Sequence, residues 1–163
     1  MLRRILIAFA FLAGLKALGA EPILKIIGPD KTLTFTAAEF TALPRTELKA
    51  VEPHEKKERF YSGVTVRELL TRAGAPLGEK MRGTALALGV LVRSKDSYTV
   101  LYALAEFDEA FSARTLLLAD QEDGRDPPAT AAPFRLVVPG DTRGARWARM
   151  VTSIEIVTLP IKP

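Results

Sequence analysis

The stretch Pro133–Gly140, followed closely by Arg146, Trp147 and Arg149, is the part of the sequence best suited to hold a charged ligand. Its apolar residues between Pro and Gly predict a short buried strand that ends abruptly, which places Arg135 and a tight turn at the rim of a sheet. Arginine offers forked donors for phosphate or carboxylate, and an indole offers a flat apolar wall. The alternative is a strand-edge charge at Arg135 and a core role for Trp147.

The other residue types that carry chemistry give weaker patterns. The sequence has no Gly-rich phosphate loop, no G-x-S-x-G elbow and no H-E-x-x-H motif. It has no cysteine, which excludes disulfides, thiolate metal sites and cysteine catalysis. With one histidine, an imidazole metal cluster is excluded as well, and His54 lies in a charged segment where a solvated side chain is expected.

Two further groups of polar residues have a structural and a functional interpretation. Asp96 and Tyr98 flank a turn between apolar segments and could orient a ligand, although an aspartate at a turn usually satisfies backbone donors. The acidic segment that follows residue 119 does not have the spacing of an EF-hand, so we expect a solvated loop there. Its members are Asp120, Glu122, Asp123 and Asp126.

The amino-terminal residues 1–20 have the layout of a secretory signal peptide. A basic start, an apolar run over 5–15 and small residues over 17–20 follow one another, and the run is short for a bilayer span. The alternatives are a retained anchor or a core helix. Removing the three basic residues of this segment lowers the formal net charge from +4 to +1, which argues against a nucleic-acid partner. We expect a periplasmic or secreted protein with no stable membrane span after cleavage.

The remainder, residues 21–163, has a length typical of one domain. Capping-box spacings predict short helices after Thr36 and Thr65, and a helical turn is expected over 104–111. The charged segment 52–59 is expected to be a solvated loop or an edge strand. Apolar segments between turn signals predict strands over 23–27, 33–35, 46–51, 84–92, 98–103, 115–119, 134–138 and 153–159. This pattern indicates an α+β domain with mixed or largely antiparallel sheets.

Several short motifs also follow one another in a characteristic order. They are Leu33–Thr36, Glu39–Phe40, Leu43–Pro44, Phe60–Val64, Arg67–Leu70, Ala73–Gly74, Asp96–Tyr98, Pro133–Gly140, Arg146–Trp147 with Arg149, and Ile154–Ile156. In this order they resemble the molybdopterin-binding domain of sulfite-oxidase-type oxidoreductases. The resemblance spans nearly all of residues 21–163. It implies a sulfite-oxidase-like α+β fold of mixed and antiparallel sheets with a few short helices.

The resemblance also implies roles for individual residues. Arg135, Arg146 and Arg149 would hold the phosphate end of a molybdopterin cofactor, and Tyr98 would lie near the metal centre. One departure is clear, because enzymes of this family bind molybdenum through a cysteine just before the segment that matches Phe60–Val64. The corresponding residues 51–59 contain no thiol, and an exposed His54 is a poor substitute. No protein residue is therefore predicted to ligate a metal.

Two functions follow from these observations. The first is an exported, molybdopterin-binding, oxidoreductase-like protein that is catalytically degenerate because the cysteine ligand is absent. The alternative is a non-catalytic periplasmic binding module that uses the same fold for a small anion or a protein partner. A structural periplasmic protein without a small ligand is a third reading.

Overall fold

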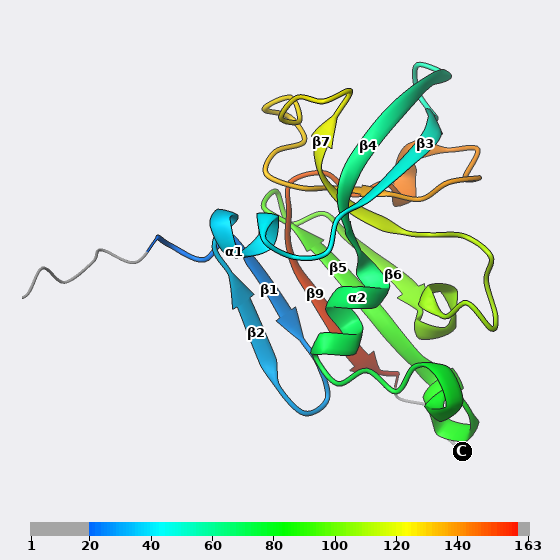
Figure 1. Cartoon of the computed structure of the whole chain (residues 1–163). Helices are drawn as coiled ribbons and strands as arrows, with labels where there is room; N and C mark the ends of the chain where they lie inside the picture. Colours follow the sequence, from blue (N-terminus) through cyan, green and yellow to red (C-terminus); the bar gives the residue numbers. More distant parts are fainter. Residues whose placement is uncertain (1–19, 160–163) are drawn as a thin grey trace, which may run out of the picture.

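Two β-sheets form the frame of the computed structural model, which describes residues 20–159 (Figure 1). The predicted signal peptide lies outside the described residues, apart from Ala20. No helix among the described residues is long and apolar enough to cross a membrane. The larger sheet has the order β2-β1-β9-β5-β6, and the smaller has the order β3-β4-β7-β8.

The larger sheet brings the two ends of the described chain together. Strand β1 pairs in parallel with β9, and the other neighbours in this sheet are antiparallel. The sheet is therefore mixed, as the sequence predicts. Its strands are β1 (Leu24–Ile27), β2 (Thr32–Phe35), β5 (Leu88–Ser94), β6 (Thr99–Ala103) and β9 (Val151–Thr158).

The smaller sheet is antiparallel throughout its three pairs of strands. Its strands are β3 (Thr46–Glu52), β4 (Lys57–Thr65), β7 (Leu117–Glu122) and β8 (Arg135–Val137). A register shift in the β4–β7 pair follows Ser62, at Gly63. A Cβ atom on Gly63 would lie 2.1 Å from the carbonyl oxygen of Leu118, so only glycine permits this close approach.

Short helices connect the strands. Thr36 caps α1 (Ala37–Thr41) with the reciprocal capping box that its spacing from Glu39 predicts. Thr65 caps α2 (Val66–Arg72). The other helices are single 3₁₀ turns or little longer: η1 (Gly78–Lys80), η2 (Gly83–Ala87), η3 (Leu104–Phe107) and η4 (Gly144–Arg146).

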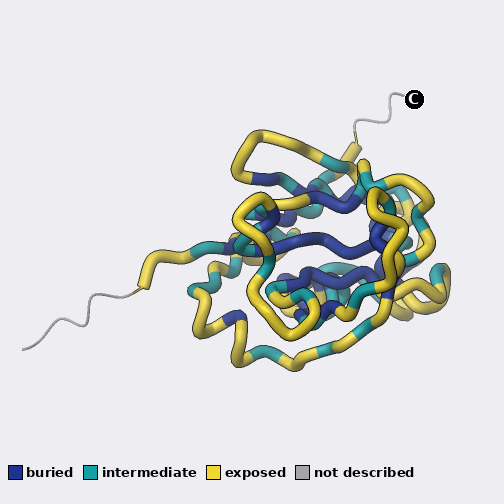
Figure 2. The backbone as a smooth tube through the Cα atoms, turned by 90° about the horizontal axis from the view of Figure 1, so that it is seen from above, coloured by how far each residue is buried: buried dark blue, intermediate teal, exposed yellow. Residues whose placement is uncertain are grey.

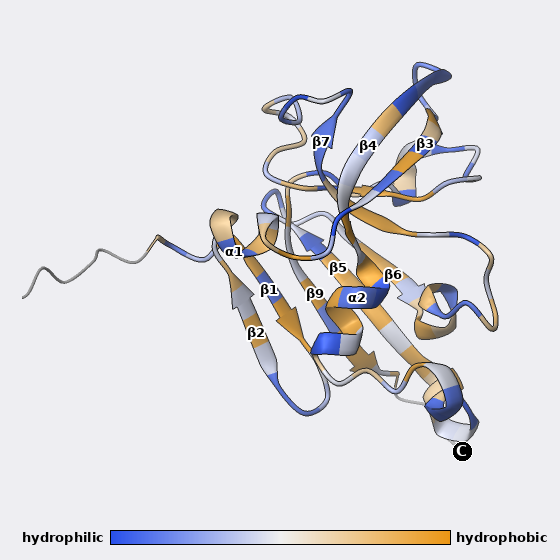
Figure 3. Cartoon of the chain, viewed as in Figure 1, coloured by the Kyte–Doolittle hydropathy of each residue, from blue (hydrophilic) through white to orange (hydrophobic). Residues whose placement is uncertain are grey.

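The core contains residues of α2 and of strands from both sheets, and Figure 2 shows buried residues at the centre of the chain with exposed loops around them. Val66, Leu69 and Leu70 of α2 are fully buried, and each such side chain contributes about 1.5–3 kcal/mol to folding. A Cβ on Gly28, just after β1, would lie 1.9 Å from the carbonyl oxygen of Ala73, so the end of α2 touches the end of β1. Figure 3 shows the same division, with hydrophobic strands inside and a hydrophilic β3–β4 tip.

Three expectations about single segments were wrong. The strand expected over 84–92 begins only at Leu88, because Gly83–Ala87 form the 3₁₀ helix η2. In the segment 52–59, residues 53–56 form the expected turn, but Glu52 is buried at the end of β3 and residues 57–59 begin β4. This strand lies between β3 and β7 and is a central strand, because Tyr61, Gly63 and Val64 bury its second half. The acidic segment is not a solvated loop throughout. Asp120 and Glu122 belong to β7 and pair with arginines of neighbouring segments, because β7 extends beyond its apolar part.

Candidate functional site

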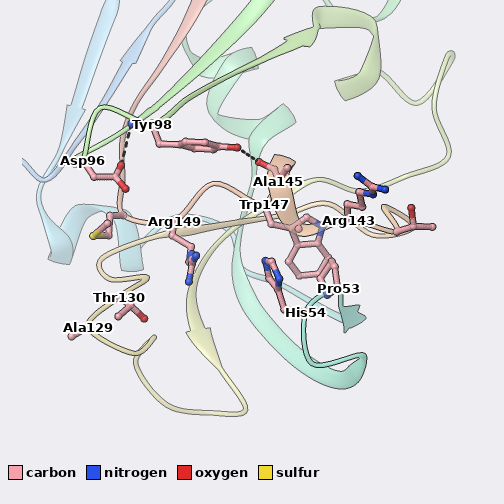
Figure 4. Close-up of a pocket in the computed structure, with 13 residues that line it drawn as sticks. Pro53, His54, Asp96, Tyr98, Ala129, Thr130, Arg143, Ala145, Trp147 and Arg149 are labelled. Atoms are coloured by element: carbon pink, nitrogen blue, oxygen red, sulfur yellow. Dashed lines mark hydrogen bonds between the residues drawn. The ribbon is translucent and has the colours of Figure 1, made fainter.

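A cleft of about 920 Å³ opens where turns of the two sheets meet (Figure 4). The β3–β4 turn contributes His54, the β5–β6 turn contributes Tyr98, and the β7–β8 loop contributes Thr130. The segment between β8 and β9 contributes Trp147 and Arg149. We call this the upper cleft. It brings together two of the four residues predicted to bind a cofactor, Tyr98 and Arg149.

A second cleft, also of about 920 Å³, lies beside the first, and we call it the lower cleft. Arg135, the third predicted residue, lines this cleft and not the upper one. His54, Thr130 and Arg149 line both clefts, so the two hollows meet at these side chains. The carboxylates of the lower cleft are Glu52, Glu55, Glu122, Asp123 and Asp126.

Arg135 is buried, and its charge is already neutralised within the protein. Its guanidinium lies 2.5 Å from a carboxylate oxygen of Glu52 and 3.3 Å from one of Glu122. The same group stacks 5.4 Å from the ring of Trp147. Its Nε–H is buried without a hydrogen-bond partner among the described residues. The first role of Arg135 is therefore to join β8 to β3 and β7.

Glu52 connects this buried ion pair to the turn that carries His54. Its carboxylate accepts hydrogen bonds of 2.7 Å from the backbone N–H groups of His54 and Glu55. Burial alone would raise the pKa of Glu52, but these hydrogen bonds and the charge of Arg135 hold it below its usual value. A charged Glu52 thus fixes the backbone of the β3–β4 turn.

Arg146, the fourth predicted residue, lines neither cleft. Its Nε lies 2.9 Å from Asp141, and its Nη1 lies 3.0 Å from Glu106. The hydrogen bonds from Arg146 hold the pKa of Asp141 below its usual value. These contacts tie η4 to η3, which gives Arg146 a structural place beside the upper cleft.

Two tyrosines of the β6 region hold η4 from the other side. The hydroxyl of Tyr98 donates a hydrogen bond of 2.6 Å to the carbonyl of Ala145, as Figure 4 shows. The hydroxyl of Tyr102 donates to the carbonyl of Arg146, and burial raises the pKa of Tyr102. Asp96 accepts from the backbone N–H of Tyr98. The turn-forming role expected of Asp96 is therefore present, and its side chain also lines the upper cleft.

The two cleft arginines without an ion pair among the described residues are one that was predicted, Arg149, and one that was not, Arg143. Arg143 and Arg149 line the upper cleft, and no carboxylate of the described residues lies within ion-pair distance of either. The sequence interpretation missed Arg143 and Thr130. Arg143 could have been found as a further basic residue of the cluster after Gly140, but nothing in the sequence places Thr130 there.

His54 is exposed, as expected, but it lies in both clefts. A Cβ atom on Gly144 would lie 2.5 Å from Nε2 of His54. Because Gly144 has no side chain, the imidazole of His54 can approach the start of η4 closely. The indole N–H of Trp147 donates to the carbonyl of Val138, which fixes the apolar wall of the upper cleft. The arrangement of cations beside a flat ring suits an anionic, planar ligand. Among the described residues, no group of three or more His, Asp or Glu side chains could hold a metal ion.

Comparisons with known proteins agree with this fold. A family model described as an oxidoreductase molybdopterin binding domain matches residues 23–162. The chain is similar to the crystal structure of the sulfane dehydrogenase SoxCD from Paracoccus pantotrophus, with a TM-score of 0.62 and 22% identity. The match covers 82% of this chain and 37% of that one, so this chain spans well under half of the length of its structural relative. A comparison with curated protein sequences gives no match. The predicted family and fold class are confirmed.

Proposed function

Because the chain belongs to the oxidoreductase molybdopterin-binding domain family, we propose that it binds a molybdopterin-type cofactor in the upper cleft. The observation that carries this proposal is the pair of arginines, Arg143 and Arg149, that line the cleft and have no carboxylate within ion-pair distance among residues 20–159. An arginine with unused donors is the side chain best suited to a phosphate group.

The residues present fit the organic part of such a cofactor. Arg149 and Arg143 would hold its anionic end, and the ring of Trp147 would form an apolar wall beside it. Arg135 and Arg146 would act as positioning residues, since their donors are used by carboxylates. When bound, the cofactor would supply the redox chemistry, and the chain would supply its placement and the compensating charge.

The residues present do not fit a thiolate-held metal. The sequence contains no cysteine, so the ligand implied by the family resemblance is missing. We propose that the protein is oxidoreductase-like in fold but catalytically degenerate. The alternative, a non-catalytic module for a small anion or a protein partner, is favoured by the same missing cysteine together with the retained cationic cleft.

Export forms a separate part of the proposal. The basic, apolar and small-residue pattern of residues 1–20 supports a periplasmic or secreted location. Amino-terminal sequencing of the protein recovered from a periplasmic extract tests it. A new amino terminus near residue 20 is expected, and a full-length chain retained in the cytoplasm would contradict export.

Purification from a host that makes molybdopterin tests cofactor binding. We expect pterin fluorescence in the denatured protein, and we expect the Arg149→Gln variant to lose most of it. The Arg82→Gln variant is a matched control, because Arg82 is exposed and lines neither cleft. If pterin and molybdenum are both absent from the wild-type protein, cofactor binding is ruled out. In that case, a rise in melting temperature with small anions would favour the binding module.

A further inference from the structure

Strand β3 forms one edge of the smaller sheet and pairs on one side only. It is the first strand in the order β3-β4-β7-β8 (Figure 1), and its register with β4 runs without a shift. In the part of the chain that the structure describes, no backbone hydrogen bond from another segment reaches residues 46–52. Strand β3 has seven residues, whereas the other edge strands, β2, β6 and β8, have four, five and three. A long, regular edge of this kind is a template for a further strand.

The contacts of Phe60 in β4 show which residues of β3 face this edge. The N–H of Phe60 donates to the carboxylate of Asp123 at 2.9 Å, and its carbonyl accepts from the N–H of Asp123 at 2.7 Å, so both groups point toward β7. Lys49 lies opposite Phe60 in the antiparallel pair. Because opposed residues of such a pair turn their backbone groups either both inward or both outward, those of Lys49 point to the free edge. By alternation along the strand, those of Glu47 and Val51 do so as well.

We call Glu47, Lys49 and Val51 the edge residues. All three are exposed, and their side chains share one face of the sheet, because alternate residues of a strand point the same way. Between them, Ala50 is buried and Leu48 packs against the core. The edge residues line neither cleft, so this surface is separate from the residues assigned to a cofactor.

The charges of the edge residues are complementary to those of a second copy of the same strand. With a two-fold axis at Leu48, Glu47 of each copy lies opposite Lys49 of the other. Axes at Glu47 or at Lys49 would instead place like charges directly opposite, which is destabilising. Among residues 20–159, Glu47 has no ion pair, and Lys49 contacts only Glu58, at 2.6 Å. That contact is half exposed and contributes little, so it does not compete strongly with pairing between copies.

Two further features favour the same register. An axis at Ala50 would place Pro53 opposite Glu47, where the ladder needs an N–H that proline lacks. In the register centred on Leu48, Arg45 lies opposite Val51, whose side chain is 55% exposed. The methylene groups of the arginine would then cover an apolar side chain that is otherwise in water.

We propose that β3 pairs in antiparallel orientation with β3 of a second copy of this chain, in the register centred on Leu48. The two four-stranded sheets then form one continuous sheet across a two-fold axis. Two strands of seven residues make an interface smaller than the standard size of about 1,600 Å². The dimer is therefore weak, with an expected dissociation constant of about 10–500 µM. The inference goes beyond the proposed function and does not depend on a cofactor.

Sedimentation velocity of the purified protein between about 5 and 500 µM tests the pairing. We expect the average mass to rise from one chain toward two. Glu47→Lys and Lys49→Glu should each weaken association about tenfold, because both opposite-charge pairs become like-charge pairs. An equimolar mixture of these two variants should associate as the wild type does, since opposite charges again face each other in the mixed dimer. Lys80→Glu is the matched control, a charge reversal at an exposed residue of η1.

Lys49→Pro tests the backbone ladder itself. It removes an N–H that points to the free edge, so the fold should be kept and association should be lost. Lys49→Thr keeps the N–H and should weaken association less, and circular dichroism and urea unfolding establish that each variant is folded. A single-chain mass at every concentration would overturn the proposal. So would a dimer that Lys49→Pro leaves intact, or a variant mixture that fails to recover association, because either result places the interface elsewhere.

Discussion

Four arginines lie within a short stretch of sequence but have different surroundings. We call Arg135 and Arg146 the paired arginines. Arg143 and Arg149, which have no ion pair among the described residues, are the unpaired arginines. The first two are held by carboxylates from distant segments, and the second two face an open cleft. The comparison shows that a cluster of basic residues contains two kinds of cation. One kind holds the scaffold together, and the other is available to a ligand.

The difference follows from desolvation. A buried charge must be matched by protein groups, because removing it from water costs several kcal/mol. Arg135 therefore needs Glu52 and Glu122, and these bonds leave few donors for a ligand. Arg149 is exposed and is hydrated in the absence of a ligand, so its donors remain available. Mutations of the paired arginines should therefore lower stability, whereas mutations of the unpaired arginines should weaken ligand binding.

The largest effect is expected from breaking the buried pair. Glu52→Ala leaves Arg135 buried with a single, longer contact to Glu122 and frees the β3–β4 turn. Removing one partner of a buried ion pair typically destabilises a protein by about 3–5 kcal/mol. Urea unfolding measures this change. The double variant Glu52→Leu with Arg135→Met should recover the part of the loss that comes from the unpaired charge of Arg135, but not the part that comes from the hydrogen bonds to the turn. Equal destabilisation in both variants would show that the charge pair is not the cause.

Acidification should weaken the paired region next. The pKa values of Asp141 and Glu52 lie below their usual values in the folded protein. The unfolded chain therefore binds protons more readily, and the stability that these groups give above about pH 4.5 is lost as the pH falls through their folded pKa values. The midpoint of unfolding should therefore decrease as the pH is lowered from about 5 to about 3. Asp141→Asn should reduce this dependence on pH, and an unchanged slope would contradict the role of Asp141.

A smaller loss of stability is expected at the partly exposed ion pairs of Arg146. Arg146→Gln removes contacts to Asp141 and Glu106 that are partly open to solvent, so a loss of about 1 kcal/mol is expected. Thermal unfolding measures it. Because Tyr98 and Tyr102 still hold η4, anion binding should weaken less than in Arg149→Gln. A greater loss of binding in Arg146→Gln would place Arg146 in direct contact with the ligand.

The smallest change in stability belongs to the unpaired arginines. Arg149→Gln and Arg143→Gln should each change the free energy of unfolding by no more than about 0.5 kcal/mol, since neither side chain has an ion-pair partner to lose among the residues that the structure describes. Differential scanning calorimetry without a ligand checks this. Destabilisation by 2 kcal/mol or more would remove the distinction between the two kinds of arginine.

Local sequence determined much of the fold. Thr36 and Glu39 form the predicted capping box, and the spacing of Val66, Leu69 and Leu70 gives α2 its buried face. The apolar residues after Pro133 form β8, within the predicted limits. These features depend on residues a few positions apart, for which hydrogen bonding and burial can be judged from the chain alone. The order of the motifs was also sufficient to identify the family.

Only the tertiary structure decided which arginines have a carboxylate partner among the described residues. Arg135 meets Glu52 across 83 positions of sequence, and Arg146 meets Glu106 across 40. The same topology makes β4 a central strand and brings His54 and Thr130 to Arg149. The type of a side chain fixes the charge it carries, but sheet order and loop paths fix its neighbours. Those neighbours decide whether a cationic side chain stabilises the protein or keeps its donors available for a ligand.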